Sequence, residues 1–320
     1  MFEKRIKEIS NLLKKDSEKT YFILTHKKHK REVYFQNNKK AIEFIKIKFD
    51  SSLKKFKTIK KIIYFLIKVR ILQIFLKRVK LSSELGNVIF VANQIKGFDL
   101  NKKIVSSFLN TKEMDKKLFV KSKEFQKKIA EKGFAPKVFE INKEFPFSKE
   151  ELLPEYSGKN DYKLFKKLYS FYKYQVVEKI SLKKHINFLV KGLKEKNIKE
   201  DFIKEVLNTL KNLNKNLLIA KVHGAFTKEQ VLIKNSKYIF TDWSLEKNLI
   251  IRDLVNFFKE EKNLLKNKNF IKLLGIYPNE VREDIKLYLI LNEIYQMIEK
   301  GKVLKQSKDR IKKFKKVFYS

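Results

Sequence analysis

The chain has no cysteine, and only four prolines, eight glycines and one tryptophan among its 320 residues. The lack of cysteine excludes disulfides and thiolate zinc sites, which fits a reducing compartment. The scarcity of proline and glycine excludes collagen-like, linker-rich and disordered classes. The four histidines are scattered and show no metal-ligand spacing. With 43% hydrophobic residues, a chain of this length can bury a substantial core, so we expect a globular protein.

Long apolar runs are also absent. The most hydrophobic stretch, residues 62–76, is too short for a bilayer span and contains Lys68 and Arg70, which would be costly in hydrocarbon. The first 15 residues alternate charged and apolar residues at helical spacing, which does not predict a signal peptide. We therefore expect a cytoplasmic protein, with peripheral contact to a membrane surface as the alternative for its basic segments.

What the chain has in excess is positive charge. Lysine and arginine number 75 against 36 acidic residues, for a formal net charge of +39. Lysines recur along the whole chain, between Ile, Phe, Leu and Asn. A bias toward residues with AT-rich codons produces this pattern, and so does selection for an anionic partner such as a membrane surface, a phosphorylated glycan or nucleic acid. The charge alone does not choose between these origins.

The first part of the chain, residues 1–80, is predicted to be an N-terminal extension. Residues 32–35 and 42–49 are strand-like runs around a turn at 36–39, which predicts a hairpin. Ser51 and Ser52 can cap a basic helix from about Leu53 to Leu76. The charged residues of this helix change face, so we expect a break near Val69.

The rest of the chain predicts two further parts and an α+β fold. Residues 81–155 read as a small antiparallel-sheet lobe, with strands at 88–92, within 97–108, at 136–141 and at 147–153, and a helix at about 116–132. Residues 156–320 read as a mostly helical lobe, with helical segments at 164–189, 198–213, 251–264 and 281–299, interrupted by strands within 231–242.

One segment has the pattern of a catalytic site. Residues 223–233 read His-Gly-Ala-Phe-Thr-Lys-Glu-Gln-Val-Leu-Ile, and residues 238–243 read Tyr-Ile-Phe-Thr-Asp-Trp. This pattern resembles the aminoglycoside phosphotransferase and choline kinase family, in which His-Gly-Asp is followed by four residues, Asn, an apolar strand, a hairpin and Ile-Asp-Trp or Ile-Asp-Phe. The resemblance spans roughly residues 30–265. It implies a two-lobed protein-kinase-like fold with ATP and Mg²⁺ as cofactors.

The resemblance also implies a role for each matching residue. His223 would support the loop backbone, Asp253 would brace the loop, and Asp242 would hold Mg²⁺ on the nucleotide phosphates. Two positions depart from the pattern: Ala225 stands where the catalytic Asp belongs, and Gln230 stands where the Asn belongs. Alanine cannot accept a proton, whereas glutamine keeps an amide oxygen that could ligate metal if the loop shifts.

In the small lobe the resemblance implies a phosphate-binding lysine and a hinge that grips adenine. The strand at 104–108 has Ser106 and Ser107 where the lysine is expected, so Lys117 and Lys121 are nearby substitutes, of which we favour Lys121, and Glu124 could pair with it. Glu151 and Leu152 fall at the position of the hinge. No glycine-rich loop is present, so phosphates would depend on lysine side chains.

Three functions remain open. The losses of the catalytic Asp, the Asn and the phosphate-binding Lys favour a pseudokinase. The Phe226-Thr227 pair resembles members of the family associated with surface polysaccharide and lipopolysaccharide, which implies a role in bacterial cell-envelope glycan metabolism. The alternative is an active ATP-dependent sugar or glycolipid kinase with another base, such as Glu229 or Glu246. Expected partners are a nucleotide and an anionic sugar or glycolipid. A basic nucleic-acid-binding protein is the third hypothesis, but no nucleic-acid motif is present, so we do not expect that partner.

Overall fold

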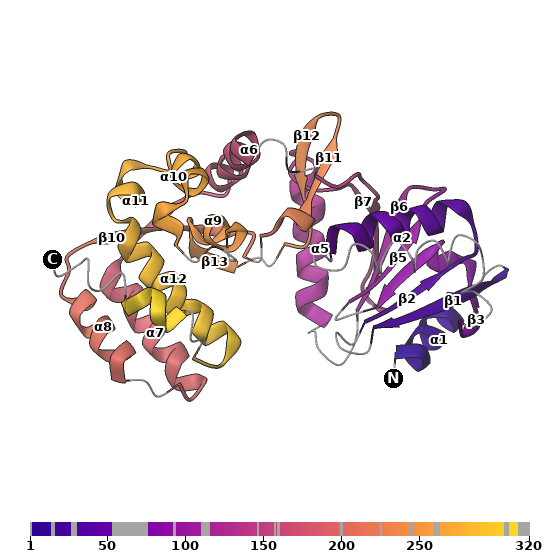
Figure 1. Cartoon of the computed structure of the whole chain (residues 1–320), viewed down its shortest axis with the longest axis horizontal. Coiled ribbons are helices and arrows are strands. Elements are labelled where there is room, and N and C mark those ends of the chain that lie inside the picture. Colours follow the sequence, from indigo (N-terminus) through magenta and orange to yellow (C-terminus); the bar gives the residue numbers. More distant parts are fainter. Residues whose placement is uncertain are drawn as a thin grey trace. The chain divides into compact units, whose positions relative to one another are not determined.

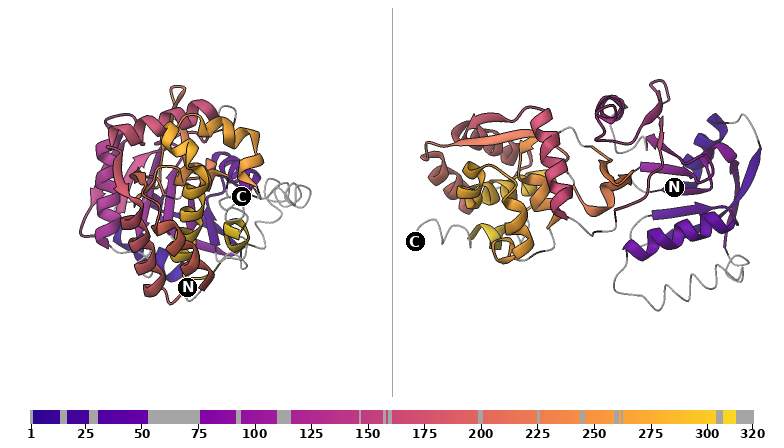
Figure 2. Two further views of the ribbon diagram at one scale, coloured as in Figure 1. Left: turned by 90° about the vertical axis from the view of Figure 1, so that its left-hand side faces the viewer. Right: turned by 90° about the horizontal axis from the view of Figure 1, so that it is seen from above.

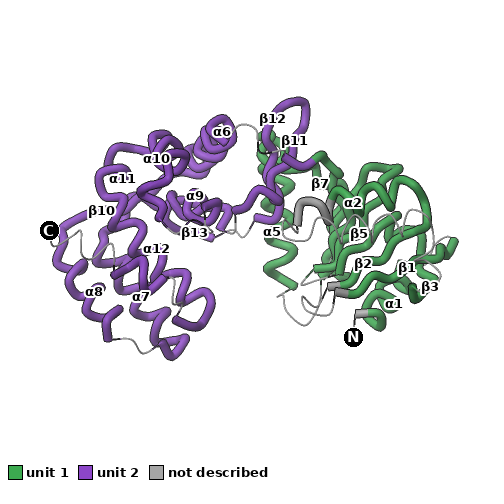
Figure 3. The backbone as a smooth tube through the Cα atoms, in the orientation of Figure 1, with its two compact units in different colours: residues 1–154 green, residues 155–320 purple. Residues whose placement is uncertain are grey.

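A computed structural model describes most of the chain, in two compact units of residues 1–154 and 155–320 (Figure 3). The described residues are 2–13, 17–26, 31–52, 76–91, 94–109, 116–145, 147–156, 158, 161–198, 201–224, 226–243, 246–258, 261, 263–303 and 307–312. Ala225 and all but the last residue of the predicted basic helix at 53–76 lie outside them.

The N-terminal unit contains one antiparallel sheet in the order β3-β1-β2-β4-β5-β6-β8-β7, with its strands side by side (Figures 1 and 2). Its strands are β1 (Glu18–His26), β2 (Arg31–Phe35), β3 (Arg78–Ser82), β4 (Val88–Val91), β5 (Gln94–Asp99), β6 (Ile104–Leu109), β7 (Val138–Asn142) and β8 (Phe147–Glu151). Pairing between β2 and β4 joins the extension strands to the predicted small-lobe strands. The strands predicted within residues 88–153 are confirmed.

Two helices cover opposite faces of this sheet, because side chains alternate along a strand. On one face Tyr21 and Ile23 pack against α1 (Phe2–Leu12). On the other, Phe22 and Phe35 pack against α2 (Lys39–Ser52). A short 3₁₀ turn, η2 (Ser83–Leu85), leads from β3 toward β4. Each face therefore has its own apolar core.

Helix α2 corrects one prediction. Residues 42–49 were expected to form a strand in a hairpin with 32–35, but they lie in α2, and β2 pairs with β1 instead. The side-chain oxygen of Asn38 accepts the backbone N–H of Ala41 at 2.9 Å, which caps the helix. Ala41, Ile42 and Ile45 then face the sheet, and this burial overrides the strand preference of the β-branched residues.

Helix α5 (Lys116–Ala130) is confirmed where the sequence predicts it, between β6 and β7. Gly133 follows it with φ of 70°, in the left-handed region that glycine adopts without strain. The buried stripe of α5 consists of Phe119, Lys123, Gln126 and Ile129. Two polar residues therefore lie in the middle of a buried helix face.

The C-terminal unit is mostly helical and contains two small sheets (Figure 1). Its strands are β9 (Glu178–Ser181), β10 (Asn216–Val222), β11 (Val231–Lys234), β12 (Lys237–Phe240) and β13 (Glu246–Leu249). Its helices are α6 (Asp161–Tyr174), α7 (Leu182–Glu195), α8 (Asp201–Lys211), η3 (Lys228–Gln230), α9 (Arg252–Phe257), η4 (Leu264–Lys266), α10 (Lys268–Leu274), α11 (Asn279–Glu283) and α12 (Ile285–Lys300). The α+β class is confirmed.

Local signals explain several helix boundaries in this unit. The segment 164–189, expected to be helical throughout, is divided by β9, and Val176 just before it has φ of 66°. Ser181 caps α7 by accepting the N–H of Lys184, and Gly301 ends α12 in the left-handed conformation. Strand β10 lies centrally between β13 and β9, so its end holds the next residues, from His223 onward, at a fixed place.

Candidate active site

The loop after β10 carries the predicted motif. His223 follows the last residue of β10, and the loop continues through η3 into the antiparallel hairpin of β11 and β12. The hairpin turn consists of Asn235 and Ser236, with φ of 48° and 61°, and two left-handed residues match the twist of the flanking strands. The predicted order of loop, strand, turn and strand is therefore confirmed.

The carboxylate of Asp253 fixes the loop backbone through hydrogen bonds. Asp253 is fully buried in the first turn of α9 and accepts the backbone N–H groups of His223 at 2.7 Å and Gly224 at 2.8 Å. It also accepts the hydroxyl of Tyr172 at 2.6 Å. Burial, with the nearby charge of Asp253, raises the pKa of Tyr172 well above its usual value. Asn256 donates to the carbonyl of Gly224, so α9 fixes this turn from two sides.

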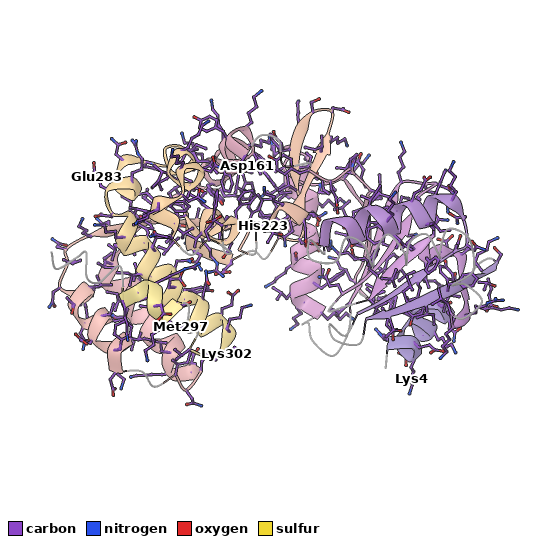
Figure 4. All side chains as sticks on the ribbon, viewed as in Figure 1. Lys4, Asp161, His223, Glu283, Met297 and Lys302 are labelled. Carbon is purple, nitrogen blue, oxygen red and sulfur yellow. The ribbon has the colours of Figure 1, made fainter. Side chains whose placement is uncertain are left out.

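His223 connects the loop to the segment around Asp242. The ring is fully buried (labelled in Figure 4), and its Nε2 lies 2.5 Å from the carbonyl oxygen of Thr241. Burial lowers the pKa of His223, so the ring is neutral at pH 7 and donates from Nε2 to this carbonyl. The ring also lies against Trp243 and Phe226, with centroid separations of 4.9 and 5.3 Å. These contacts fit a structural role.

Asp242 has an unusual backbone conformation. Its φ is 61°, which costs a residue other than glycine about 1 kcal/mol. The neighbours on both sides are buried: Thr241 contacts His223, and Trp243 packs on Phe171 with ring centroids 4.3 Å apart. Asp242 itself is partly exposed. The packed neighbours therefore hold the partly exposed Asp242 in a left-handed conformation, and such backbone conformations cluster at functional positions.

Gln230 uses its side chain inside its own turn. Its Oε1 accepts the backbone N–H of Thr227 at 2.7 Å and the Thr227 hydroxyl at 3.1 Å. A carbonyl oxygen has two lone pairs, and both are engaged here. A metal ligand at Gln230 would have to break these bonds, and the extra methylene relative to asparagine is what lets the side chain fold back.

Glu246 and Glu229, the two alternative candidates for a catalytic base, lie in different environments. Strand register sets Glu246 opposite Val222, the residue before His223. The Glu246 carboxylate accepts the side-chain amide of Asn248 and lies 3.6 Å from Nε of the buried Arg252. Glu229 is exposed on η3. The carboxylate beside the loop is thus engaged in a local polar cluster.

Lys121 and Glu124, predicted to form a phosphate-binding pair, have separate environments. Lys121 is exposed on α5. Glu124 forms an ion pair with Lys143 at 2.7 Å, and both side chains are largely exposed, at 46% and 69%. Exposed pairs of this kind contribute little to stability. The structure does not bring Lys121 and Glu124 together.

Glu151 and Leu152, the predicted hinge residues, bond within the N-terminal unit. The backbone N–H of Glu151 donates to the carbonyl of Lys137 at 2.9 Å, and that of Leu152 donates to the carbonyl of Lys103 at 2.8 Å. These two donors therefore complete the sheet. An adenine ring would need other backbone groups of this segment.

Sequence reasoning missed a buried ion pair under α5. Lys123 Nζ lies 3.2 Å from a carboxylate oxygen of Glu150 on β8, with side-chain exposures of 5% and 4%, and Gln126 donates to the same oxygen. Ser107 and Ser148 pair across β6 and β8, and neither hydroxyl has a hydrogen-bond partner among the described residues. The lysine is on the helix and the glutamate on the strand β8.

The sequence carries only part of the signal for this pair. Lys123 lies four residues after Phe119 and three before Gln126, on the stripe that α5 buries. Lys116 lies three residues before Phe119 and is exposed, so helical spacing alone does not identify the buried lysine.

Within the described residues, no group of three histidine or acidic side chains could hold a metal ion by itself. A cation at Asp242 would therefore need oxygen ligands from a bound molecule or water. In the same part of the chain, no helix is long and apolar enough to cross a membrane.

The chain was compared with known proteins. No protein-family model and no curated protein matches it. Choline kinase LicA from Streptococcus pneumoniae is similar with a TM-score of 0.48 and 13% identity, covering 70% of this chain and 88% of that one. Choline kinase from Cryptosporidium parvum Iowa II has a TM-score of 0.47 at 13% identity, covering 72% and 85%. An ADP-bound aminoglycoside phosphotransferase has a TM-score of 0.41 at 14% identity, covering 70% and 89%.

At these identities and TM-scores the similarities carry no conclusion about this chain, so its fold and its chemistry have to be argued from its own residues. The order of its elements agrees with the arrangement that the sequence resemblance implies. Strands β4, β5 and β6, then α5, then β7 and β8 follow the order of a kinase small lobe, and a catalytic-type loop and hairpin lie within the helical C-terminal unit.

Proposed function

We propose that this chain is a kinase-fold protein that binds a nucleotide together with a divalent cation at Asp242 and does not transfer phosphoryl groups. One observation carries the proposal. The scaffold that positions Asp242 is complete, with the His223–Thr241 bond and the Asp253 carboxylate under the loop, whereas residue 225 is alanine. A partly exposed acidic residue held in a left-handed conformation in this way fits cation binding better than a remnant does.

The residues present fit Mg²⁺ held on a nucleotide. Magnesium takes one or two carboxylates and completes its coordination with phosphate oxygens and water. Asp242 can supply one carboxylate, and Gln230 supplies no free side-chain oxygen in its present turn. When bound, the cation would neutralise phosphate charge. The role of Asp242 is to hold it at the end of the hairpin.

Three features support the absence of phosphoryl transfer. Alanine at 225 has no group that can orient or deprotonate an attacking hydroxyl. The Gln230 oxygen is engaged in its own turn. The carboxylate next to the loop, Glu246, is engaged with Asn248 and Arg252. With no catalytic Asp at 225 and with the Gln230 oxygen and the Glu246 carboxylate both engaged, the loop can support nucleotide binding but offers no base for phosphoryl transfer.

The test is nucleotide binding by calorimetry with ATP or ADP, with and without Mg²⁺, in the wild type and in Asp242→Ala. Asp201→Ala is the matched control, because that carboxylate belongs to the same unit and its side chain is 97% exposed. We expect Mg²⁺-dependent binding that weakens about tenfold or more in Asp242→Ala, roughly 1.4 kcal/mol, and is unchanged in Asp201→Ala. Equal affinities in the two variants, or no binding at millimolar nucleotide, would refute the proposal.

An active kinase with a non-standard base is the second candidate function. The register that sets Glu246 opposite Val222 favours it, since Val222 directly precedes His223, where the loop begins. Glu246→Gln would then abolish phosphoryl transfer to a sugar or glycolipid acceptor, whereas Glu229→Gln, on the exposed turn, would not. Absence of turnover in the wild type, with nucleotide bound, would decide for the first candidate.

We infer that the protein acts in cell-envelope glycan metabolism, with an anionic sugar or glycolipid as partner. The support is the Phe226-Thr227 sequence of the loop and the net charge of +39, which attracts anionic surfaces. Co-sedimentation with vesicles containing lipopolysaccharide, compared with neutral vesicles, tests this setting. Equal binding to both vesicle types, or to neither, would contradict it.

A further inference from the structure

A cavity of about 620 Å³ lies in the N-terminal unit, where the extension strands meet the small-lobe strands. Its walls come from segments far apart in the sequence: the start of β1, the start of α2, the turn through η2, and the turn between β5 and β6. The small-lobe strands alone could not form it, because β1 and α2 belong to the extension. A volume of this size is typical of sites for small organic molecules.

The lining of the cavity is basic. Four lysines line it, with two carboxylates, Asp99 and Glu84. Asp99 is engaged through Oδ1, which accepts two backbone N–H groups of its own turn. The ammonium of Lys102 lies 3.8 Å from Glu84 and 4.0 Å from Asp99, between the two acids. Both carboxylates therefore face Lys102.

Three further lysines remain to act on a ligand. Lys19 comes from β1, and Lys39 and Lys40 come from the first turn of α2. Lys40 donates to the neutral side-chain oxygen of Asn101 at 2.8 Å, so this contact orients the ammonium without neutralising it. The excess positive charge converges from two elements onto one cavity, and these exposed ammonium groups attract an anion through their summed field.

The start of α2 adds backbone donors at the same place. The N-cap Asn38 satisfies the N–H of Ala41, whereas the first N–H groups of a helix have no partner within it. The positive end of the dipole of this 14-residue helix therefore lies beside Lys39 and Lys40. Lysines and helix amides together form the donor set that phosphate groups prefer.

The floor of the cavity is rigid. Gln36 donates to the carbonyl of Gly86 at 3.1 Å and accepts the amide of Asn87 at 3.1 Å. Asn87 in turn accepts the backbone N–H of Leu100 at 2.8 Å. A side chain at Gly86 would place Cβ only 2.5 Å from the backbone of Phe98, so the turn is closely packed. Preorganised donors lower the entropy cost of binding.

We propose that this cavity binds a phosphorylated small organic molecule, such as a sugar phosphate. Four lysines against two carboxylates leave the lining with two excess positive charges, which exceed what a single carboxylate ligand needs and match a dianionic phosphate. The volume exceeds that of an inorganic ion, which leaves room for the organic group beside the amides. The site is separate from Asp242 and needs no divalent cation, so it goes beyond the proposed function.

The test uses calorimetry with glucose 1-phosphate and with inorganic phosphate, in EDTA. The lining variant is Lys39→Gln/Lys40→Gln, and the control is Lys46→Gln/Lys80→Gln, which removes the same charge from exposed positions of α2 and β3 outside the cavity. We expect the lining variant to bind glucose 1-phosphate at least tenfold more weakly, with the control unchanged. Equal weakening in both variants would show diffuse attraction to a basic protein and would overturn the proposal.

Two further measurements separate the possible outcomes. Bound glucose 1-phosphate should protect Lys19 from acetylation, and leave Lys46 reactive, in a mass-spectrometric footprint. Tighter binding of glucose 1-phosphate than of inorganic phosphate supports an organic ligand, whereas equal affinities, or no binding at millimolar concentration, overturn it. Asp242→Ala should bind glucose 1-phosphate as the wild type does, so failure of the nucleotide proposal would leave this one standing.

Discussion

Replacing Asp253 by asparagine should destabilise the C-terminal unit by about 3–5 kcal/mol. The buried carboxylate accepts three hydrogen bonds, from the N–H groups of His223 and Gly224 and from the Tyr172 hydroxyl. Asparagine keeps the shape but has one acceptor oxygen, so its NH₂ group must face at least one donor. The orphaned donor costs about 1–3 kcal/mol, and each surviving bond loses about 1 kcal/mol because its acceptor is no longer charged.

The assay is urea denaturation followed by tryptophan fluorescence. Trp243 is the only tryptophan of the chain, is 4% exposed, and lies 4.9 Å from the His223 ring, so it reports on this cluster. Tyr172→Phe removes one donor and leaves the charge, and should cost about 1–2 kcal/mol. Because both residues act on one network, the double variant should cost less than the sum of the single variants.

A loss below about 0.5 kcal/mol for Asp253→Asn is the level of an ordinary surface substitution and would contradict this role of Asp253. Additive effects of Asp253→Asn and Tyr172→Phe would contradict it as well, since residues in one network do not act independently. Either result would mean that the carboxylate does not hold the loop.

Three other perturbations test separate parts of the structure. Ile45→Ala should cost about 2–4 kcal/mol and the exposed Ile47→Ala under about 0.5, because in α2 the two side chains lie on different faces, whereas a strand would set them on the same one; urea midpoints of the two variants decide. Lys123→Met or Glu150→Gln alone should lower the free energy of unfolding by about 3–5 kcal/mol, because each leaves a buried group without its partner. The double variant Lys123→Met/Glu150→Met should recover most of this stability, and additive losses would contradict the pairing. Burial lowers the pKa of His185 to about 4, so between about pH 6.5 and 4 the unfolded chain binds a proton that the folded chain does not, and the stability present above pH 6.5 falls as the pH falls. His185→Leu should remove about 2–3 kcal/mol of this decline, seen by comparing denaturation midpoints of both proteins at pH 7.5 and 4.5.

Much of the fold was predictable because its signals are local. Apolar runs bounded by turn residues predicted the strands within 88–153, and helical spacing with a terminal glycine predicted α5. The loop and hairpin around Asp242 were predictable because they depend on a contiguous pattern of residue types. The roles assigned to the site residues, and the three-part division at residues 80 and 155, stay predictions.

Positions that depend on a distant partner were not predictable in this way. The apolar residues around 42–49 fit the period of a strand as well as that of a helix. Ile45 and Ile47 alternate as in a strand, whereas Ala41 and Ile45 share a helix face. Only packing on the sheet decides in favour of α2. A sequence shows that Gln230 has an oxygen, but not that the oxygen turns back to Thr227.

The sequence by itself therefore determined the α+β class, the order of the small-lobe strands and the alanine at position 225, because residue identity and short-range spacing are sufficient for these. The tertiary structure alone decided which of many lysines is buried, pairing Lys123 with Glu150 and leaving Lys121 exposed. It also brought lysines 19, 39 and 40 to one cavity. The physical reason is that burial and charge depend on what lies across the fold, and local spacing carries no information about a partner far along the chain.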